Sequence, residues 1–278
     1  MRAAFALFLV FFSTLSFSQN ERLVPAMGAL ERGDVTQAID SLKPLAATGD
    51  IDAQYTLATV LENAKPPLQD LEGARQWYER AAEGGNANAQ NNLAAMHFDG
   101  RGALKDYVEA ARLYRLAADQ GNPTAQTNLA LMYGMGLGVP QDMAEMAKLL
   151  KQASEAGVAR AQAQLARMYL DGEGVAQNAA EAVKWFRAAA SQDHEVAQFF
   201  LAVLLQKGIG TARDLEGAFA WFRRAAEHGN RLAMLELARC YDLGLGVPND
   251  PAQGQAWRDR ANAKPAPKPA PPAAAEKK

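Results

Sequence analysis

The chain has 278 residues, of which 49% are hydrophobic and 22% charged, a composition typical of a protein with a well-packed core. Its net charge is −2, and the chain without residues 1–18 and 263–278 carries 24 basic and 30 acidic residues. An acidic body has no general electrostatic reason to bind nucleic acid or anionic lipid, so neither partner is expected.

The first 18 residues have the pattern of a secretory signal peptide. Arg2 precedes a short apolar run, and the small residues Ser16 and Ser18 stand just before a predicted cleavage site at Gln19. The run is shorter than the about 20 apolar residues that span a bilayer, which favours cleavage over an uncleaved anchor. The mature chain is therefore expected to be exported, periplasmic or secreted, with no membrane span.

Residues 19–49 are predicted to form N-terminal capping helices, because Asp34 precedes Gln37 at the spacing of a capped helix start. From there the chain repeats itself every 36 residues, which is the signature of a solenoid of stacked units. Each unit begins with Ala-Gln followed by Leu-Ala, except that Met234 replaces Gln in the last unit. The first alanines are Ala53, Ala89, Ala125, Ala161, Ala197 and Ala233.

Each unit is predicted to hold two helices. In the third unit, Ala125, Leu129 and Met132 follow the spacing of one buried helix face, and the helix is expected to end at the segment from Gly134 to Pro140, which contains the pair Gly136 and Gly138. This Gly-x-Gly recurs after a predicted helix rather than a strand, so it is interpreted as a turn and not as a phosphate loop. The second helix opens with a capping Asp or Asn, at Asp34, Asp70, Asp106, Asp142, Asn178, Asp214 and Asp250.

Inside the second helix, one register holds only alanine, which indicates close helix packing. The Trp, Tyr and Phe residues one turn earlier are interpreted as core. A glutamine column in the first helices is expected to form hydrogen bonds between units. The alanines are Ala81, Ala117, Ala153, Ala189, Ala225 and Ala261, and the glutamines are Gln54, Gln90, Gln126, Gln162 and Gln198.

The order A-Q-x-x-L-A-x-M-Y, G-x-G-V, Asp cap, A-x-x-W-[YF]-x-x-A-A resembles the Sel-1-like repeat family. The resemblance implies an all-α fold, a right-handed α-solenoid of helical hairpins related to tetratricopeptide repeats, acting as a protein-interaction scaffold, often in bacterial envelopes. The cysteine pairs of one secreted branch are absent. The predicted repeats are 50–85, 86–121, 122–157, 158–193, 194–229 and 230–262, and residues 263–278 form a Pro/Ala/Lys tail that is expected to be disordered.

No catalytic residue, cofactor or metal site is expected. His97, His194 and His228 occupy three different registers, and none has the spacing of a zinc site. Cys240 falls in an apolar register, and neither a G-x-S-x-G nor an S-x-x-K motif occurs. The chain is therefore predicted not to be an enzyme.

The binding surface is predicted on the side of the first helices that points away from their buried face, which lines the concave groove in tetratricopeptide repeats. It is polar in the early units and becomes apolar in the last two, where clustered exposed apolar groups would mark an interaction site. The predicted groove residues are Asp52, Tyr55, Thr59, Asn88, Asn91, Thr124, Thr127, Arg160, Arg167, Phe199, Val203, Leu235 and Arg239.

These features predict a non-catalytic scaffold or adaptor of the cell envelope that binds a protein or peptide segment in its groove. Arg167→Ala or Phe199→Ala is expected to weaken partner capture with little loss of thermal stability. Three alternatives stay open: a periplasmic regulator that restrains a sensor kinase, a peptidoglycan- or β-lactam-acting hydrolase, and self-association through the apolar part of the groove.

Overall fold

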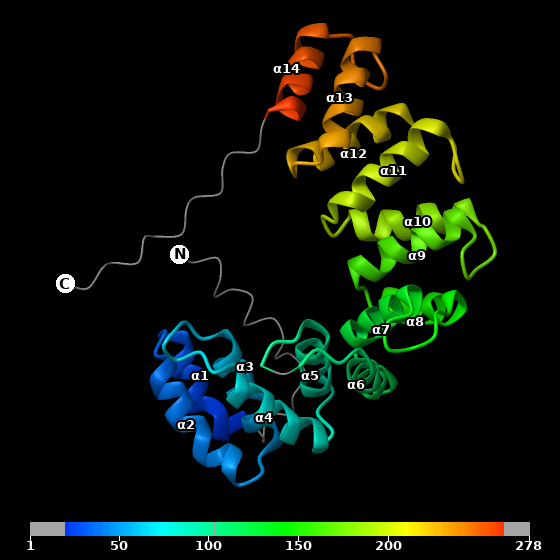
Figure 1. Ribbon diagram of the computed structural model, residues 1–278. Helices are drawn as coiled ribbons and strands as arrows, with labels where there is room; N and C mark the ends of the chain where they lie inside the picture. Colours follow the sequence, from blue (N-terminus) through cyan, green and yellow to red (C-terminus); the bar gives the residue numbers. More distant parts are fainter. Residues whose placement is uncertain (1–19, 103, 264–278) are drawn as a thin grey trace. The chain divides into compact units, whose positions relative to one another are not determined.

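The computed structural model describes residues 20–102 and 104–263. The predicted signal peptide and the predicted tail from residue 264 onward lie outside this range. Within it all regular structure is helical, which confirms the all-α prediction (Figure 1). The chain divides into two compact units, one ending at Asp142 and the other beginning at Met143.

The first unit starts with a 3-10 helix and continues with seven α-helices over its described residues. They are η2 (Asn20–Leu23), α1 (Val24–Glu31), α2 (Val35–Ala47), α3 (Ile51–Asn63), α4 (Leu71–Glu83), α5 (Ala87–Asp99), α6 (Tyr107–Asp119) and α7 (Pro123–Met135). The second unit contains α8 (Met143–Glu155), α9 (Ala159–Asp171), α10 (Ala179–Ala190), α11 (Glu195–Lys207), α12 (Leu215–Glu227), α13 (Arg231–Leu243) and α14 (Pro251–Asn262).

Within each unit a helix packs chiefly on the helices just before and just after it in the chain. The closest pairs are the predicted hairpins, α3 with α4 and α5 with α6 in the first unit, and α9 with α10, α11 with α12 and α13 with α14 in the second. The prediction of helical hairpins at a 36-residue period is thereby confirmed.

Most of these helices are preceded by a residue whose side chain accepts a hydrogen bond from a backbone N–H of the first turn. The predicted aspartates of the second helices accept from a backbone N–H three residues on, as in the 2.8 Å bond from Gly73 N to Asp70 Oδ1. The first helices are capped in the same way by Asn86, Asn122 and Asn230. Each such cap stabilises its helix by about 1 kcal/mol, so the recurring Asp and Asn fix where the helices start.

The second glycine of each turn is required by close packing between repeats. Gly210 has φ +71°, and a Cβ there would overlap the carbonyl oxygen of Ala179, the first residue of α10 in the preceding repeat. Gly138 stands in the same relation to Tyr107 at the start of α6. The turn therefore sets the distance between successive repeats, and only glycine fits it.

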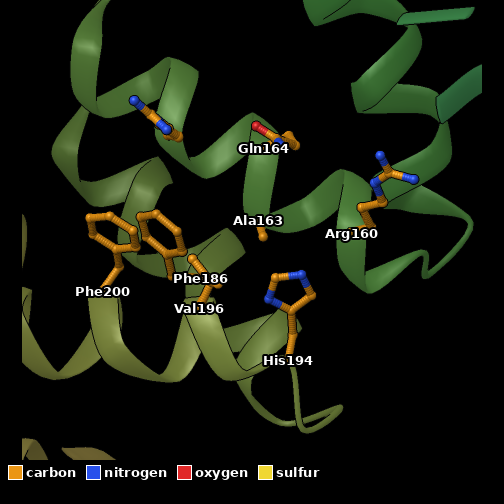
Figure 2. Close-up of a pocket in the computed structure, with 8 residues that line it drawn as sticks. Arg160, Ala163, Gln164, Phe186, His194, Val196 and Phe200 are labelled. Carbon is orange, nitrogen blue, oxygen red and sulfur yellow. The ribbon is translucent and has the colours of Figure 1, made fainter. Parts of the chain in front are cut away.

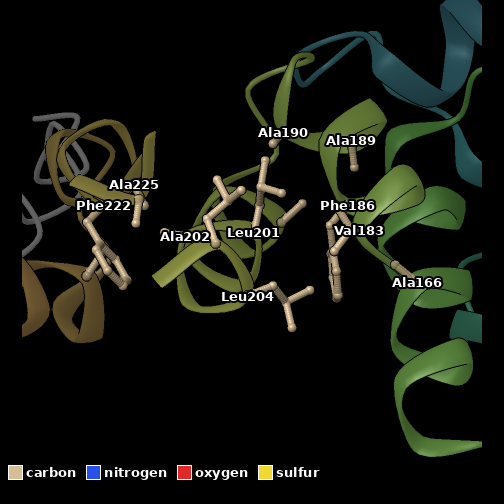
Figure 3. Close-up of a cluster of buried hydrophobic side chains, with 14 of the residues drawn as sticks. Ala166, Val183, Phe186, Ala189, Ala190, Leu201, Ala202, Leu204, Phe222 and Ala225 are labelled. Carbon is tan, nitrogen blue, oxygen red and sulfur yellow. The ribbon is translucent and has the colours of Figure 1, made fainter. Parts of the chain in front are cut away.

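The core of the second unit is built from the alanine register and the aromatic residues before it. Figure 3 shows Leu201 and Leu204 of α11 between Phe186 of α10 and Phe222 of α12. Both rings are buried, and each contributes about 2–3 kcal/mol by leaving water. The alanines of this register, such as Ala189, have no room for a larger side chain.

The glutamine column joins helices across the repeat boundary. The buried amide of Gln162 donates to the carbonyl oxygen of Ser154 at the end of α8, over 3.1 Å, and accepts a bond from Gln192. The same backbone bond is made by Gln54, Gln90, Gln126 and Gln198. The expected role of the column in bonding between repeats is confirmed.

None of the helices in residues 20–102 and 104–263 combines the length and the apolar character that crossing a bilayer requires.

Candidate functional site

A pocket of about 340 Å³ lies in the second unit between the first helices α9 and α11 (Figure 2). Its lining comes from three helices and one capping residue. These are Arg160, Ala163, Gln164 and Arg167 of α9, Phe186 of α10, His194 just before α11, and Val196 and Phe200 of α11.

One end of the pocket is aromatic. The rings of Phe186 and Phe200 are stacked, with 5.3 Å between centroids and 14° between planes. Figure 2 shows them side by side, with Val196 and Ala163 between them and the other end. Because the Val196 side chain is 47% exposed and Phe200 is half-buried, this wall offers apolar surface to an incoming group.

The other end is polar, with His194 facing the side of the pocket where Arg160 lies (Figure 2). Nδ1 of His194 accepts the backbone N–H of Ala197 over 3.2 Å, so the imidazole caps α11. In the neutral ring the proton is then on Nε2. Burial lowers the pKa of His194 and favours the neutral ring; a backbone hydrogen bond and the charge of Glu195 oppose this shift, and the charge of Arg160 adds slightly to it.

Two guanidinium groups lie on the rim. Arg160 and Arg167 are seven residues apart on α9, which places them on one face about 10 Å apart along the axis. Arg167 is exposed and makes an ion pair of 3.4 Å with the exposed Asp171, a contact worth little in water. Arg160 makes no ion pair with any residue that the structure describes. Both charges are available to a ligand.

The structure brings only Arg160 and Arg167 of the predicted groove residues into this pocket. Phe199, Val203 and Leu235 are half-buried instead of forming an exposed patch, and Phe199 packs its ring 5.9 Å from that of Phe222. The exposed apolar groups of this face are Val196 and Leu232. Arg239 is exposed and lies 3.7 Å from Glu236.

In the first unit, three of the predicted polar residues accept hydrogen bonds from neighbouring side chains outside the predicted set. Thr59 accepts from the hydroxyl of Tyr78 over 3.1 Å, Asn88 accepts from Asn122 over 2.9 Å, and Asn91 accepts from Asn128 over 3.3 Å. The remaining predicted residues of this stretch are on the surface in different degrees: Asp52 and Tyr55 are half-buried and Thr124 is exposed.

Thr127 is a correction to the prediction. Its side chain is 3% exposed, and its hydroxyl donates to the carbonyl oxygen of Pro123 over 2.8 Å. Residues in the same register of the other repeats are at most half-exposed, as at Tyr55 and Phe199. This register therefore faces neighbouring side chains, such as Tyr78 beside Tyr55 and Phe222 beside Phe199, and not open solvent.

Sequence reasoning did not identify Gln164, Phe186, His194 and Phe200 as lining residues. The sequence predicts Phe186 as a core residue and assigns His194 no binding role. Gln164 and Phe200 follow Arg160 and Val196 by four residues, so the i, i+4 spacing on the exposed register was the signal that could have found them.

Outside the pocket, the part of the chain that the structure describes offers little for metal binding or nucleophilic reaction. It contains no group of three or more His, Cys, Asp or Glu residues able to hold a metal. Burial raises the pKa of Cys240 to about 11, which keeps the thiol protonated and unreactive.

The stacked hairpins and their surface pocket define a helical-repeat protein. The sequence model of the Sel1 repeat matches residues 51–86, 87–122, 123–158, 159–194, 196–230 and 231–261. The chain therefore belongs to the Sel1 repeat family, whose members are generally non-catalytic protein-interaction scaffolds.

Two solved structures resemble the chain closely. A Sel1 repeat protein from Oxalobacter formigenes is 30% identical, with a TM-score of 0.75 over 88% of this chain and 98% of that one. A protective antigen of uropathogenic Escherichia coli with an SLR fold is 32% identical, with a TM-score of 0.77 over 80% of this chain. The match covers only 48% of the antigen. No protein of curated description matches the chain significantly.

Proposed function

We propose that this protein is an exported, non-catalytic adaptor of the cell envelope that holds a segment of another protein against the first helices of its repeats. The observation that carries the proposal is the pocket between α9 and α11, where apolar surface and two arginines lie on the first-helix face. Membership in a family of interaction scaffolds supports it, and the signal-like residues 1–18 support export.

Site-specific photocrosslinking in cells tests the proposal. A photoreactive amino acid replaces Gln164, which is half-buried at the pocket, and in a matched control it replaces Ala220, which is exposed on the second helix α12. We expect a discrete crosslinked partner from position 164 and none from position 220. Equal crosslinking from both positions, or none from either, would contradict the adaptor function.

Export is tested separately. Cell fractionation followed by N-terminal sequencing of the mature protein should find it outside the cytoplasm and beginning at Gln19. Recovery of the full-length chain from the cytoplasm would contradict the envelope location but would leave the binding surface untouched.

A further inference from the structure

The pocket between α9 and α11 combines two chemical features that select a particular kind of partner. Phe200 and Val196 form an apolar wall that the buried ring of Phe186 supports from behind, and Arg160 and Arg167 lie at the rim on either side of Gln164. None of the eight lining residues is acidic. The chain is acidic as a whole, whereas the pocket lining carries two positive charges and no negative one; Asp171, which pairs with Arg167, and Glu195, beside His194, lie outside the lining.

Charge complementarity argues against the chain's own C-terminal segment as the occupant. That segment contains Lys264, Lys268, Lys277 and Lys278 against a single Glu276. Its lysines would meet the two arginines with like charge, which costs free energy. A segment rich in carboxylates has the opposite sign and can form bidentate hydrogen bonds with each guanidinium.

We propose that this pocket binds an acidic, extended peptide segment in which one aromatic or large aliphatic side chain is flanked by carboxylates on both sides. This inference rests on the proposed adaptor function and specifies its partner. The apolar side chain packs on Phe200 and Val196, and the carboxylates pair with Arg160 and Arg167.

The distance between Arg160 and Arg167 determines how far apart the carboxylates of the peptide must be. The two arginines are about 10 Å apart along α9, and an extended chain advances about 3.3 Å per residue. Two acidic residues about three positions apart therefore reach both guanidinium groups, with the apolar residue between them. A pocket of about 340 Å³ is at the small end of the range for ligand sites, with room for one large side chain.

A selection experiment tests the inference without knowledge of the natural partner. The purified mature protein is used to select from a phage-displayed library of random 12-residue peptides. We expect enriched sequences to carry an aromatic or aliphatic residue with Asp or Glu on both sides. Enrichment of basic or uncharged sequences, or of no sequence, would overturn the inference.

Charge-reversal variants locate the binding. The most enriched peptide, labelled with fluorescein, is titrated by fluorescence polarisation with the wild type and with the double variant Arg160→Glu/Arg167→Glu. We expect at least a tenfold loss of affinity, and weaker wild-type binding at high salt because exposed charges are screened. The matched control is Arg223→Glu on α12, an exposed arginine outside the pocket, which should bind like the wild type.

The two proposals can fail separately. If position 164 crosslinks to a partner but the selected peptides are not acidic, the inference falls and the adaptor function stands. If acidic peptides bind in an arginine-dependent way but no cellular partner is crosslinked, the pocket chemistry stands and the adaptor function falls. Equal melting temperatures of the variants and the wild type exclude unfolding as the cause of lost binding.

Discussion

The side-chain amide of Gln192 donates a hydrogen bond of 2.9 Å to Oε1 of Gln162, although 30 residues separate them. Gln162 in turn donates to the carbonyl oxygen of Ser154, so one buried side chain in α9 bonds to α8 of the preceding repeat and to the turn after α10 of its own repeat. Two repeats earlier in the chain, Gln120 donates the equivalent hydrogen bond to Gln90. The relation makes these glutamines part of the packing between repeats.

Gln162→Ala is therefore expected to destabilise the fold more than Gln192→Ala. The first change removes two hydrogen bonds and leaves a cavity in a buried place, at a cost of about 2–3 kcal/mol. The second removes the bond to Gln162 and a long bond of 3.4 Å to the carbonyl oxygen of Ala188, both from an exposed side chain, at a cost of about 0.5–1 kcal/mol. Urea unfolding monitored by circular dichroism measures the loss of stability in both variants. Equal losses would show that the buried glutamine carries no special role.

Asp193 stands where the other repeats have glycine, and its φ is +60°. We expect Asp193→Gly to be about 0.5–1 kcal/mol more stable than Asp193→Ala, because both lose the side-chain hydrogen bond and only glycine adopts this conformation without steric cost. Asp193→Ala is the control, since it removes the 3.2 Å hydrogen bond from Gln198 without relieving the backbone. A thermal melt of Asp193→Gly no higher than that of Asp193→Ala would contradict the argument.

The sequence predicted the repeat architecture well because each recurring residue meets a local requirement of the backbone. A capping residue such as Asp70 must precede a helix, and Gly138 stands where a backbone approaches too closely for a side chain. These requirements hold whatever the rest of the molecule does. The 36-residue period then predicted the number of successive hairpins.

The binding face was predicted less well, because exposure depends on what covers a residue. Thr127 and Arg160 were both placed on the outward side of their helices, yet only Arg160 is exposed. Thr127 shares the register of Ala163, three positions after Arg160, and about 60° of helix rotation therefore separates the exposed register from the one that faces its neighbours. Periodicity in a single sequence does not resolve such a rotation, and the packed structure does.

Phe199→Ala and Arg167→Ala, which the sequence predicts to be equally harmless to stability, should differ. Phe199 packs on Phe200 and Phe222, so its truncation is expected to cost about 2–3 kcal/mol and lower the melting temperature by several degrees. Arg167 is exposed and makes one weak ion pair, so its truncation should cost under about 1 kcal/mol. Differential scanning fluorimetry of the two variants compares them directly, and similar melting temperatures would show that the Phe199 ring is free.

His194 makes the stability of the folded protein depend on pH. Burial lowers the pKa of this imidazole below its ordinary value of 6.5, against the opposing effects of a backbone hydrogen bond and of Glu195, and the charge of Arg160 adds slightly to the lowering. The unfolded chain then takes up the proton at a higher pH than the folded chain. Stability is present in full above pH 6.5 and is lost as the pH falls through the folded pKa.

The variant His194→Asn isolates this contribution, because Asn86, Asn122 and Asn230 cap the equivalent helices with a group that does not titrate. We expect the wild type to lose more stability than His194→Asn between pH 7.5 and pH 5.0, measured by urea unfolding at both values. The variant removes one titrating group while preserving the cap, so the difference between the two slopes belongs to His194. If the two proteins lose stability in parallel, the imidazole is not held in its neutral form by the fold, and its bond to Ala197 does not persist in solution.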